Sequence, residues 1–260
     1  MKDTWTIASW NVNSLKVREE QVIAWLEKTN TNIIAIQETK VEDDKFPQNE
    51  WDKMGYKAYF TGQKTYNGVA LLSNLELNNI ATNILPFQDT QARSISAVYK
   101  DTLIVNLYVP NGSTIESDKF QYKLRFLTAL EEYLKQKLQE YKNIVVLGDF
   151  NIAPADIDVH DPKAWHESTL TTKAVRDKLQ NIINLGFTDS FREHNSENQE
   201  FSWWDYRQAS FRRNMGLRID LILVSNNLIP KCSKTFIDKE PRKNERPSDH
   251  TPVVAEFMHE

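Results

Sequence analysis

The stretch Ile144-Val145-Val146-Leu147-Gly148-Asp149-Phe150-Asn151 decides the fold class of this chain. Four consecutive apolar residues, three of them β-branched, predict a strand that is buried on both faces. The strand ends at a glycine, an acid and an amide, and in open α/β sheets such carboxyl ends collect ligands and chemistry. Asp149 and Asn151 are therefore candidate functional residues, although Asp and Asn are also common turn formers.

Polar side chains follow other predicted strands in the same way. Residues 5–10 lead to Asn11, residues 33–36 lead to Glu38, and residues 103–108 lead to Tyr108 and then Asn111. A carboxylate at the end of a buried strand is a candidate ligand for Mg²⁺, which prefers hard oxygen donors. The alternative interpretations are an exposed strand-end glutamate and a core tyrosine with a solvated hydroxyl.

Hydrophobic periodicity predicts an α/β fold with mixed sheets. Helices are expected at residues 18–28, 118–141 and 174–185, and further strands at 56–61, 68–73, 94–99 and 219–224. The helix at 118–141 lies between two predicted strands, which favours a crossover connection, whereas residues 56–108 resemble a β meander. Residues 155–172 predict a surface loop in which Asp156, Asp158 and Asp161 are turn residues.

Composition is that of a soluble globular protein, with 260 residues of which 40% are hydrophobic and 26% charged. Cys232 is the only cysteine, so no intramolecular disulfide is possible. The first residues lack the apolar stretch of a signal peptide or membrane span, so a cytoplasmic location without membrane attachment is expected.

Net charge argues mildly against nucleic acid as a partner, because it is −4 at neutral pH. The distribution of basic residues matters more than the net charge. One group comprises Arg207, Arg212, Arg213 and Arg218, and a second comprises Lys239, Arg242, Lys243 and Arg246. Such residues are candidates for backbone binding, although bases in loops are often only solvated.

Asp220 lies among apolar residues of a predicted strand near the C-terminus. A buried carboxylate is costly without a partner, so Asp220 is expected to meet a cation, a metal or a histidine. His250, which directly precedes the last predicted strand, is the candidate, because the other four histidines lie in polar loops or the tail.

Seven motifs together resemble the exonuclease III family of the endonuclease/exonuclease/phosphatase superfamily. They are Trp10-Asn11-Val12-Asn13, Gln37-Glu38-Thr39-Lys40, Tyr108-Val109-Pro110-Asn111-Gly112, Gly148-Asp149-Phe150-Asn151, Trp203-Trp204-Asp205-Tyr206-Arg207, Leu217-Arg218-Ile219-Asp220 and Pro247-Ser248-Asp249-His250. Each motif alone is weak, but the series spans the chain in the family's order. The resemblance implies one domain over residues 1–260, folded as a four-layered α/β sandwich of two facing mixed β-sheets flanked by helices.

The resemblance also implies a metal-dependent phosphodiesterase of DNA base-excision repair that is a monomer. It would cleave 5' to abasic sites and remove nucleotides or blocking groups from the 3' ends of duplex DNA. The implied metal is Mg²⁺, for which Mn²⁺ can substitute, held by Glu38 and Asn11 with contributions from Asp249, Asp149 and Asn151. Asp149 would activate water, Asn151 and Tyr108 would hold phosphate oxygens, and Asp220 would fix the tautomer of His250, which contacts the phosphate.

The resemblance further implies which residues select the substrate. Asn111 would support the phosphate, and the DNA backbone would be held by Arg207, Arg212 and Arg213. A pocket for a sugar without a base would be lined by Trp203, Leu217 and Ile219. Two alternatives stay open. A phosphatase of the same superfamily that acts on lipid or inositol phosphates would have the same catalytic residues. A catalytically inactive DNA-binding module would have the same basic residues. The loop at 157–172 matches the family poorly, which leaves the balance of exonuclease and endonuclease activity open.

Overall fold

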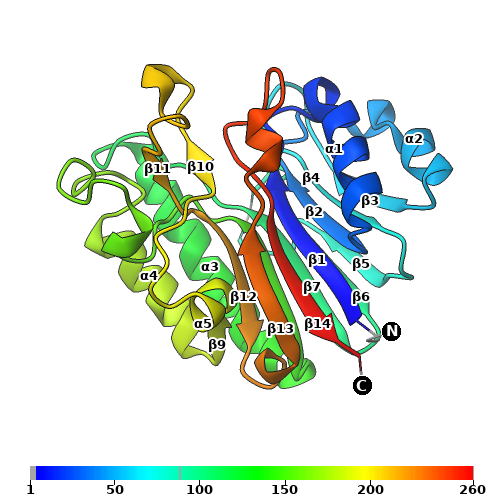
Figure 1. Ribbon diagram of the computed structural model, residues 1–260. Coiled ribbons are helices and arrows are strands. Elements are labelled where there is room, and N and C mark those ends of the chain that lie inside the picture. The colour runs from blue at the N-terminus through cyan, green and yellow to red at the C-terminus, as the bar shows by residue number, and fades with distance from the viewer. Residues whose placement is uncertain (1–3, 88, 260) are drawn as a thin grey trace.

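Two six-stranded sheets face each other in the computed structural model, which describes residues 4–87 and 89–259 (Figure 1). The first sheet has the order β13 (Cys232–Ile237), β14 (Val253–Met258), β1 (Thr4–Asn11), β2 (Ile33–Gln37), β4 (Val69–Ser73) and β3 (Lys57–Thr61). The second has the order β5 (Asn78–Thr82), β6 (Ser94–Tyr99), β7 (Thr102–Tyr108), β8 (Asn143–Asp149), β12 (Asp220–Ser225) and β9 (Phe187–Asp189). Both sheets are mixed, because β1 and β2 pair parallel, as do β7 and β8, while their neighbours pair antiparallel.

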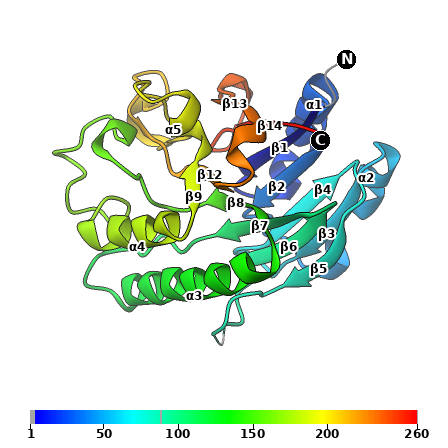
Figure 2. The ribbon, with the colours of Figure 1, turned by 90° about the horizontal axis from the view of Figure 1, so that it is seen from below.

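Helices cover the outer faces of the two sheets, which confirms the predicted four-layered sandwich. The helices are α1 (Leu15–Thr29), α2 (Gln48–Lys53), α3 (Asp118–Glu140), α4 (Lys173–Asn184) and α5 (Ser190–His194). Figure 2 shows α3 and α4 along one outer face and α1 and α2 beside the other sheet. Short 3-10 turns lie at Asp43–Lys45, Asp156–Asp158, Arg207–Ala209, Ile229–Lys231 and Glu240–Lys243, and a small separate ribbon is formed by β10 (Trp203–Trp204) and β11 (Gly216–Leu217).

Strand β8 is buried on both faces, as its apolar run predicts. Ile144 and Val146 pack in the core between the second sheet and helices α3 and α4. Val145 and Leu147 point the other way, into the core between the two sheets. The alternation follows from the two-residue repeat of a strand, and it places β8 at the centre of the molecule.

Gly148 allows β8 to lie close to its parallel neighbour β7. Its φ is +147°, and a Cβ atom there would come within 1.9 Å of the Leu107 carbonyl oxygen. Any side chain would therefore force the strands apart just before Asp149. The glycine of the motif has a steric role, which is to let the chain reach the sheet edge in register.

The predicted crossover is confirmed, since α3 connects the parallel strands β7 and β8. The helix begins at a Ser117 cap, whose Oγ accepts from the Phe120 amide at 3.2 Å. Its apolar side, which includes Leu127 and Leu130, packs on the second sheet. This packing fixes the direction in which β8 returns to the sheet.

The segment from residue 155 to residue 172 is not wholly a surface loop, and this part of the prediction is wrong. Asp158 is fully buried, as is Val159, and Leu170 is 7% exposed. The Asp158 carboxylate pairs with Arg218, with Oδ1 at 2.7 Å from Nε, and also with Arg192. A buried ion pair cannot be anticipated from a polar stretch, because its cations lie far away in the sequence.

No helix within residues 4–87 and 89–259 is long and apolar enough to cross a membrane.

Candidate active site

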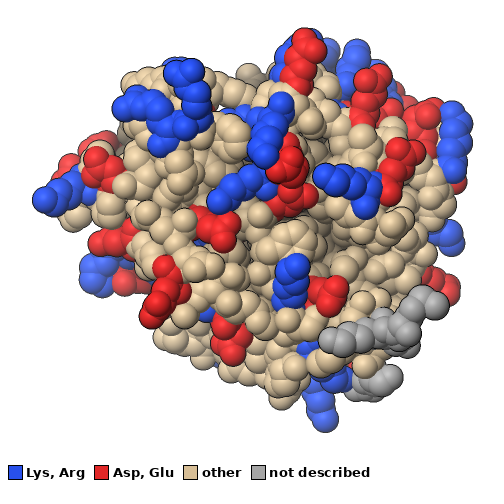
Figure 3. All heavy atoms as spheres, in the orientation of Figure 1, with Lys and Arg blue, Asp and Glu red and all other residues tan. Residues whose placement is uncertain are grey.

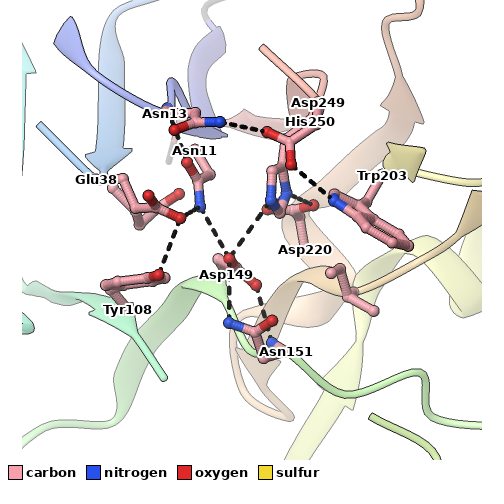
Figure 4. A network of polar contacts seen from close by, with 12 residues as sticks. Asn11, Asn13, Glu38, Tyr108, Asp149, Asn151, Trp203, Asp220, Asp249 and His250 are labelled. Atoms are coloured by element: carbon pink, nitrogen blue, oxygen red, sulfur yellow. Dashed lines mark hydrogen bonds and ion pairs between the residues drawn. The ribbon is translucent and has the colours of Figure 1, made fainter. Parts of the chain in front are cut away.

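Polar residues from both sheets converge at one edge of the sandwich (Figure 4). Strands β1, β2, β7 and β8 end there, at Asn11, just before Glu38, at Tyr108 and at Asp149. Strand β12 runs antiparallel to β8 and starts there, so Asp220 pairs directly with Asp149. The carboxyl ends of some strands and the starts of their antiparallel neighbours necessarily share an edge, which explains why residues distant in sequence meet.

Asp149 is the centre of the cluster. Its Oδ2 accepts from the Asn11 amide at 2.9 Å and from the Asn151 side-chain amide at 3.3 Å, and its Oδ1 accepts from the Asn151 backbone amide at 2.9 Å. Asn151 adopts the left-handed conformation, with φ of 49°, and also donates to the Val109 carbonyl at 2.9 Å. These contacts hold the Asp149 carboxylate in place, and Asp149 is only 1% exposed.

Glu38 receives three donors. Its Oε1 accepts from Tyr108 Oη at 2.9 Å and from Asn11 Nδ2 at 2.9 Å, and its Oε2 lies 2.9 Å from the Lys40 ammonium. Burial alone would raise the pKa of Glu38, but Lys40 and the amide outweigh it and hold that pKa below its ordinary value. Glu38 is therefore a carboxylate that is kept ionised and already faces a cation.

His250 and Asp220 form a second buried unit. The His250 Nδ1 lies 2.8 Å from Asp220 Oδ2 and 3.1 Å from Oδ1, which confirms the predicted partner of the buried acid. Ser202 Oγ donates to the same carboxylate at 2.7 Å. With Nδ1 held as a donor, the Nε2 atom points to the cluster and lies 3.7 Å from Asp149 Oδ2.

Burial and charge in this site raise two pKa values, that of Asp149 and that of His250. Burial raises the pKa of Asp149 to about 7, although the neighbouring imidazolium of His250 opposes the rise. Burial would lower the pKa of His250, but the carboxylates of Asp220 and Asp149 overcome it and raise that pKa to about 10. The arrangement thus favours a protonated His250 beside a carboxyl group that titrates near neutral pH.

Asp249 is held on the other side of His250. Its Oδ1 accepts from Asn13 Nδ2 at 3.1 Å, and its Oδ2 accepts from the Trp203 indole at 3.0 Å. The segment around Trp203 pairs with the segment around His250, with an isolated bridge between these two residues. This bridge brings β10 to the sheet edge and places Trp203 beside the cluster.

Leu217 and Ile219 lie in a small apolar cluster together with Trp203 and Trp165. Both aliphatic side chains are buried, at 0% and 1% exposure, whereas the two tryptophans are partly exposed and meet edge to face with ring centroids 5.9 Å apart. Trp165 was not expected here, and its place in a polar segment gave no periodic signal.

Asn111 lies beside Asn151, to whose Oδ1 its side-chain amide donates at 3.2 Å. A cavity of about 620 Å³ opens next to it and is bordered by Tyr108, Arg93 and Lys119. Arg93 stacks over the Tyr108 ring at 4.7 Å from its centroid and donates to the Tyr108 carbonyl at 3.2 Å. The cavity therefore continues the cluster along a partly basic wall.

The two predicted basic groups are only partly surface groups. Arg207, Arg212 and Arg213 are exposed in the loop after β10, and Figure 3 shows basic side chains gathered there at the upper left. Arg218 and Arg242 are buried, so their assignment to a basic surface is wrong. Arg218 pairs with Asp158 and with Asp189 Oδ2, at 2.7 Å each, because a buried guanidinium requires such partners.

A divalent metal fits the donor chemistry around Glu38. The carboxylate is ionised and its Oε2 already contacts the Lys40 ammonium, which shows that this oxygen accepts a cation. Asp149, Asp220 and His250 also lie close enough for a cation, with ligand atoms within 4.8 Å of one another. In that group, Asp220 is engaged by His250 and Ser202.

Sequence reasoning missed Ser202, Lys40 and Asn13 as members of the cluster. Lys40 Nζ donates to Asn13 Oδ1 at 2.6 Å and thereby links two of the motifs. Lys40, Asn13 and Ser202 lie within or next to quoted motifs. Their position beside motif acids and amides was the available signal, but their contacts are decided by tertiary structure.

Comparison with known proteins identifies close relatives. A model of the Endonuclease/Exonuclease/phosphatase family matches residues 8–250. The chain is 36% identical to exodeoxyribonuclease III of Haemophilus influenzae, over 96% of this chain and 98% of the relative. The structure of a Neisseria 3' phosphatase bound to a product DNA hairpin superimposes with a TM-score of 0.96 at 42% identity, covering 98% of this chain and all of the other. An AP endonuclease from Archaeoglobus fulgidus gives 0.94 at 36% identity, over 97% and 99% of the two chains.

Proposed function

Because this chain belongs to the endonuclease/exonuclease/phosphatase family, we propose that it is a metal-dependent nuclease of DNA base-excision repair. It cleaves the backbone 5' to abasic sites, and it removes nucleotides and blocking groups from the 3' ends of duplex DNA. The observation that carries the proposal is the cluster in which Asp149 and His250 approach within 3.7 Å, each held by separate partners. Such a site can activate water and neutralise a phosphate at one point.

Asp149 takes the proton of the attacking water. A base works best when its pKa is near the working pH, and burial raises the pKa of Asp149 to about 7. Asn11 and Asn151 hold the carboxylate by hydrogen bonds of 2.9 to 3.3 Å, so little reorganisation is needed when the proton moves.

His250 stabilises the charge that builds on the phosphate oxygens. Its Nδ1 proton is donated to Asp220, which leaves the Nε2 proton directed into the cluster. Tyr108 and Asn151 lie on the other sides of Asp149 (Figure 4). The Tyr108 hydroxyl, which donates to Glu38, and the Asn151 amide, which donates to Val109 and Asp149, would exchange these acceptors for phosphate oxygens. Fixed donors of this kind are each worth roughly 3 to 4 kcal/mol of transition-state stabilisation.

Glu38, Asn11 and Asp249 would hold Mg²⁺, for which Mn²⁺ can substitute, and Asp149 and Asn151 lie next to this set. When bound, such a metal would supply positive charge against the charge that builds on the phosphate and on the departing 3' oxygen. The preference for Mg²⁺ follows from the hard oxygen donors of this set.

Substrate selection is assigned to the surroundings of the cluster. Trp203 packs against the buried Leu217 and Ile219, and we assign to these three residues the apolar wall for a sugar that lacks its base, with the partly exposed Trp203 as the face that the sugar meets. Extrusion of such a sugar is cheaper than that of a normal nucleotide, because no base is unstacked. The phosphates are contacted by Asn111 and by three exposed arginines, Arg207, Arg212 and Arg213. DNA binding should therefore weaken as salt rises and should depend little on the nucleotide sequence.

The experiment compares three duplexes: one with a tetrahydrofuran abasic analogue, one with a nick that carries a 3' phosphate, and one intact. Each is incubated with Mg²⁺ or with EDTA. Incision 5' to the lesion, release of the 3' phosphate and shortening from 3' ends are expected only with Mg²⁺. Activity on an inositol phosphate or phospholipid instead would keep the family and overturn the substrate.

Two variants test the catalytic assignment. Asp149→Asn and His250→Asn are each expected to lower the rate on the preferred duplex by at least a hundredfold, on the scale of a lost electrostatic group. Asp161→Asn is the matched control, because that acid is exposed in the segment before α4. Near-normal turnover of either active-site variant would exclude its assigned role, and inactivity of every DNA substrate would exclude the nuclease itself.

The active form is a monomer in the cytoplasm, with residues 1–260 acting as one domain. The hydrophobic core between the sheets, which joins Ile7 near the start of the chain to Val145 and Phe257, supports one folding unit. A single unfolding transition and a mass near 30.3 kDa by light scattering are expected. Two transitions or a dimer mass would correct this part of the proposal.

A further inference from the structure

Helix α3 buries a lysine at a position where its neighbours are apolar. Lys123 is fully buried, and Phe120, Phe126 and Leu127 are buried around it on the same helix. The structure gives it a definite set of partners: Nζ donates to the carbonyl oxygens of Asn151 at 2.6 Å, Thr169 at 2.9 Å and Asn111 at 3.3 Å. The three acceptors match the three protons of an ammonium group.

Each acceptor belongs to a different segment beside the candidate active site. Asn151 follows β8, Asn111 lies in the turn after β7, and Thr169 lies in the segment before α4. Two of these residues also meet through their side chains, since the Asn111 amide donates to Asn151 Oδ1 at 3.2 Å. The Lys123 ammonium thus holds the backbone of both Asn111 and Asn151, while the side chains of these two residues face the cluster.

The turn that carries Asn111 lies directly on the helix. Gly112 has φ of +97°, and a Cβ atom there would lie 3.3 Å from Lys123 Cδ and 3.2 Å from Phe120. The lysine stem therefore supports the turn by contact as well as by its hydrogen bond. The position of Asn111 is set from two directions.

Stability alone is a poor reason for this lysine. Burial lowers the pKa of Lys123 while the charge of Asp149 opposes the fall, so the ammonium that donates to three carbonyl oxygens is held at a cost. A buried charge is weak evidence for stability, because replacing a whole buried ion pair by apolar residues of similar volume is often neutral or favourable. A buried charge that binds three carbonyls has a more specific effect, which is to define where those carbonyls lie.

We propose that Lys123 is a positioning residue for the reaction: by binding the carbonyls of Asn111, Asn151 and Thr169, it sets the side-chain amides of Asn111 and Asn151 against the phosphate. The proposal rests on the proposed function, in which both amides hold phosphate oxygens. Lys123 touches neither water nor substrate and acts through Asn111 and Asn151. A displacement of such groups by about 1 Å can cost on the order of a hundredfold in rate.

The test uses the full chain with Lys123→Met, which keeps the length and apolar contacts of the side chain and removes its three protons. Lys135→Met is the matched control, because Lys135 is exposed on the same helix. Single-turnover cleavage and DNA affinity are measured separately, together with thermal unfolding. We expect a single-turnover rate about 10- to 100-fold lower and a Kd within about threefold of wild type. The midpoint of unfolding should fall, because three carbonyl oxygens lose their donor, so rates are compared at a temperature at which both proteins are folded.

The outcomes separate this proposal from the proposed function. Wild-type protein that cleaves none of the DNA substrates refutes the proposed function. Wild-type protein that is active, with Lys123→Met within about twofold of its single-turnover rate, refutes only the role of Lys123. A lower rate that is fully matched by weaker DNA binding also refutes it, because positioning acts on the chemical step.

A second variant decides the matter if Lys123→Met does not fold. Lys123→Gln retains an amide donor and is expected to keep part of the activity, with a rate between those of wild type and the methionine variant. Failure of both variants to fold overturns the proposal, since Lys123 would then be required for the fold itself. Rescue of rate by glutamine, without a change in Kd, supports positioning.

Discussion

Replacing Asp220 by asparagine tests the charge of His250 most directly. In the wild-type site, His250 Nδ1 lies 2.8 Å from Asp220 Oδ2, and both residues are buried. Burial would lower the pKa of His250, yet Asp220 and then Asp149 raise it from 6.5 to about 10. Asp220→Asn keeps the shape of the side chain and removes the charge that contributes most to the rise.

The size of the effect follows from the protonated fraction of His250. At about pH 8, a group whose pKa is about 10 is almost fully protonated, whereas one whose pKa is about 6.5 is roughly 3% protonated. If the imidazolium is the active form, the single-turnover rate at about pH 8 should fall about 30-fold. This factor takes the ordinary pKa of about 6.5 for the variant, in which burial still lowers the pKa of His250 and Asp149 still raises it.

The pH profile shows in which direction each protonation changes the rate. Asp149 must lose its proton to act as a base, so activity is lost as pH falls through about 7, and His250 must keep its proton, so activity is lost as pH rises through about 10. The wild-type protein should therefore show a plateau between these values, which belong to the coupled pair. In Asp220→Asn the pKa that limits activity at alkaline pH falls below the pKa that limits activity at acidic pH, so no plateau of full activity remains.

The assay is single-turnover cleavage of the preferred duplex from about pH 5.5 to 10.5, with saturating protein and Mg²⁺. Glu256→Gln is the matched control, because it makes the same acid-to-amide change on β14, where that side chain accepts from Ser233. A wild-type plateau in Asp220→Asn, with less than about a threefold loss at pH 8, would refute the role of the imidazolium.

Three further changes test the metal set, the pocket and the buried ion pairs. Glu38→Gln should raise the Mg²⁺ concentration for half-maximal rate by at least about tenfold and weaken Mn²⁺ binding measured by electron paramagnetic resonance; unchanged binding would remove Glu38 from the metal set. Trp203→Ala should lower abasic incision roughly tenfold and reduce discrimination against intact duplex, with Trp203→Phe as the control that keeps an aromatic ring; equal discrimination would exclude the pocket. Arg218→Met should lower the free energy of unfolding by about 3 to 5 kcal/mol in urea, because Asp158 and Asp189 would lose a buried cation, and a loss below about 1 kcal/mol would contradict that reasoning.

Local sequence pattern determined much of the framework. The apolar run from Ile144 to Leu147 predicted a strand buried on both faces, and β8 is that strand, because alternate side chains enter two different cores. Asp220 was expected to have a partner, since an isolated buried carboxylate is too costly, and His250 supplies it. Both inferences rest on periodicity and desolvation, which act on residues wherever they lie in the fold.

Tertiary structure decided the remaining contacts. Nothing in the sequence indicated that Asp158, in a polar segment, would be buried against Arg218, 60 residues away. Nor did it indicate that the buried ammonium of Lys123 would bind three carbonyls from separate segments. A sequence pattern reports how strongly each residue avoids or seeks water, whereas the choice of partner depends on which chain segments the packing of the two sheets brings within hydrogen-bond distance.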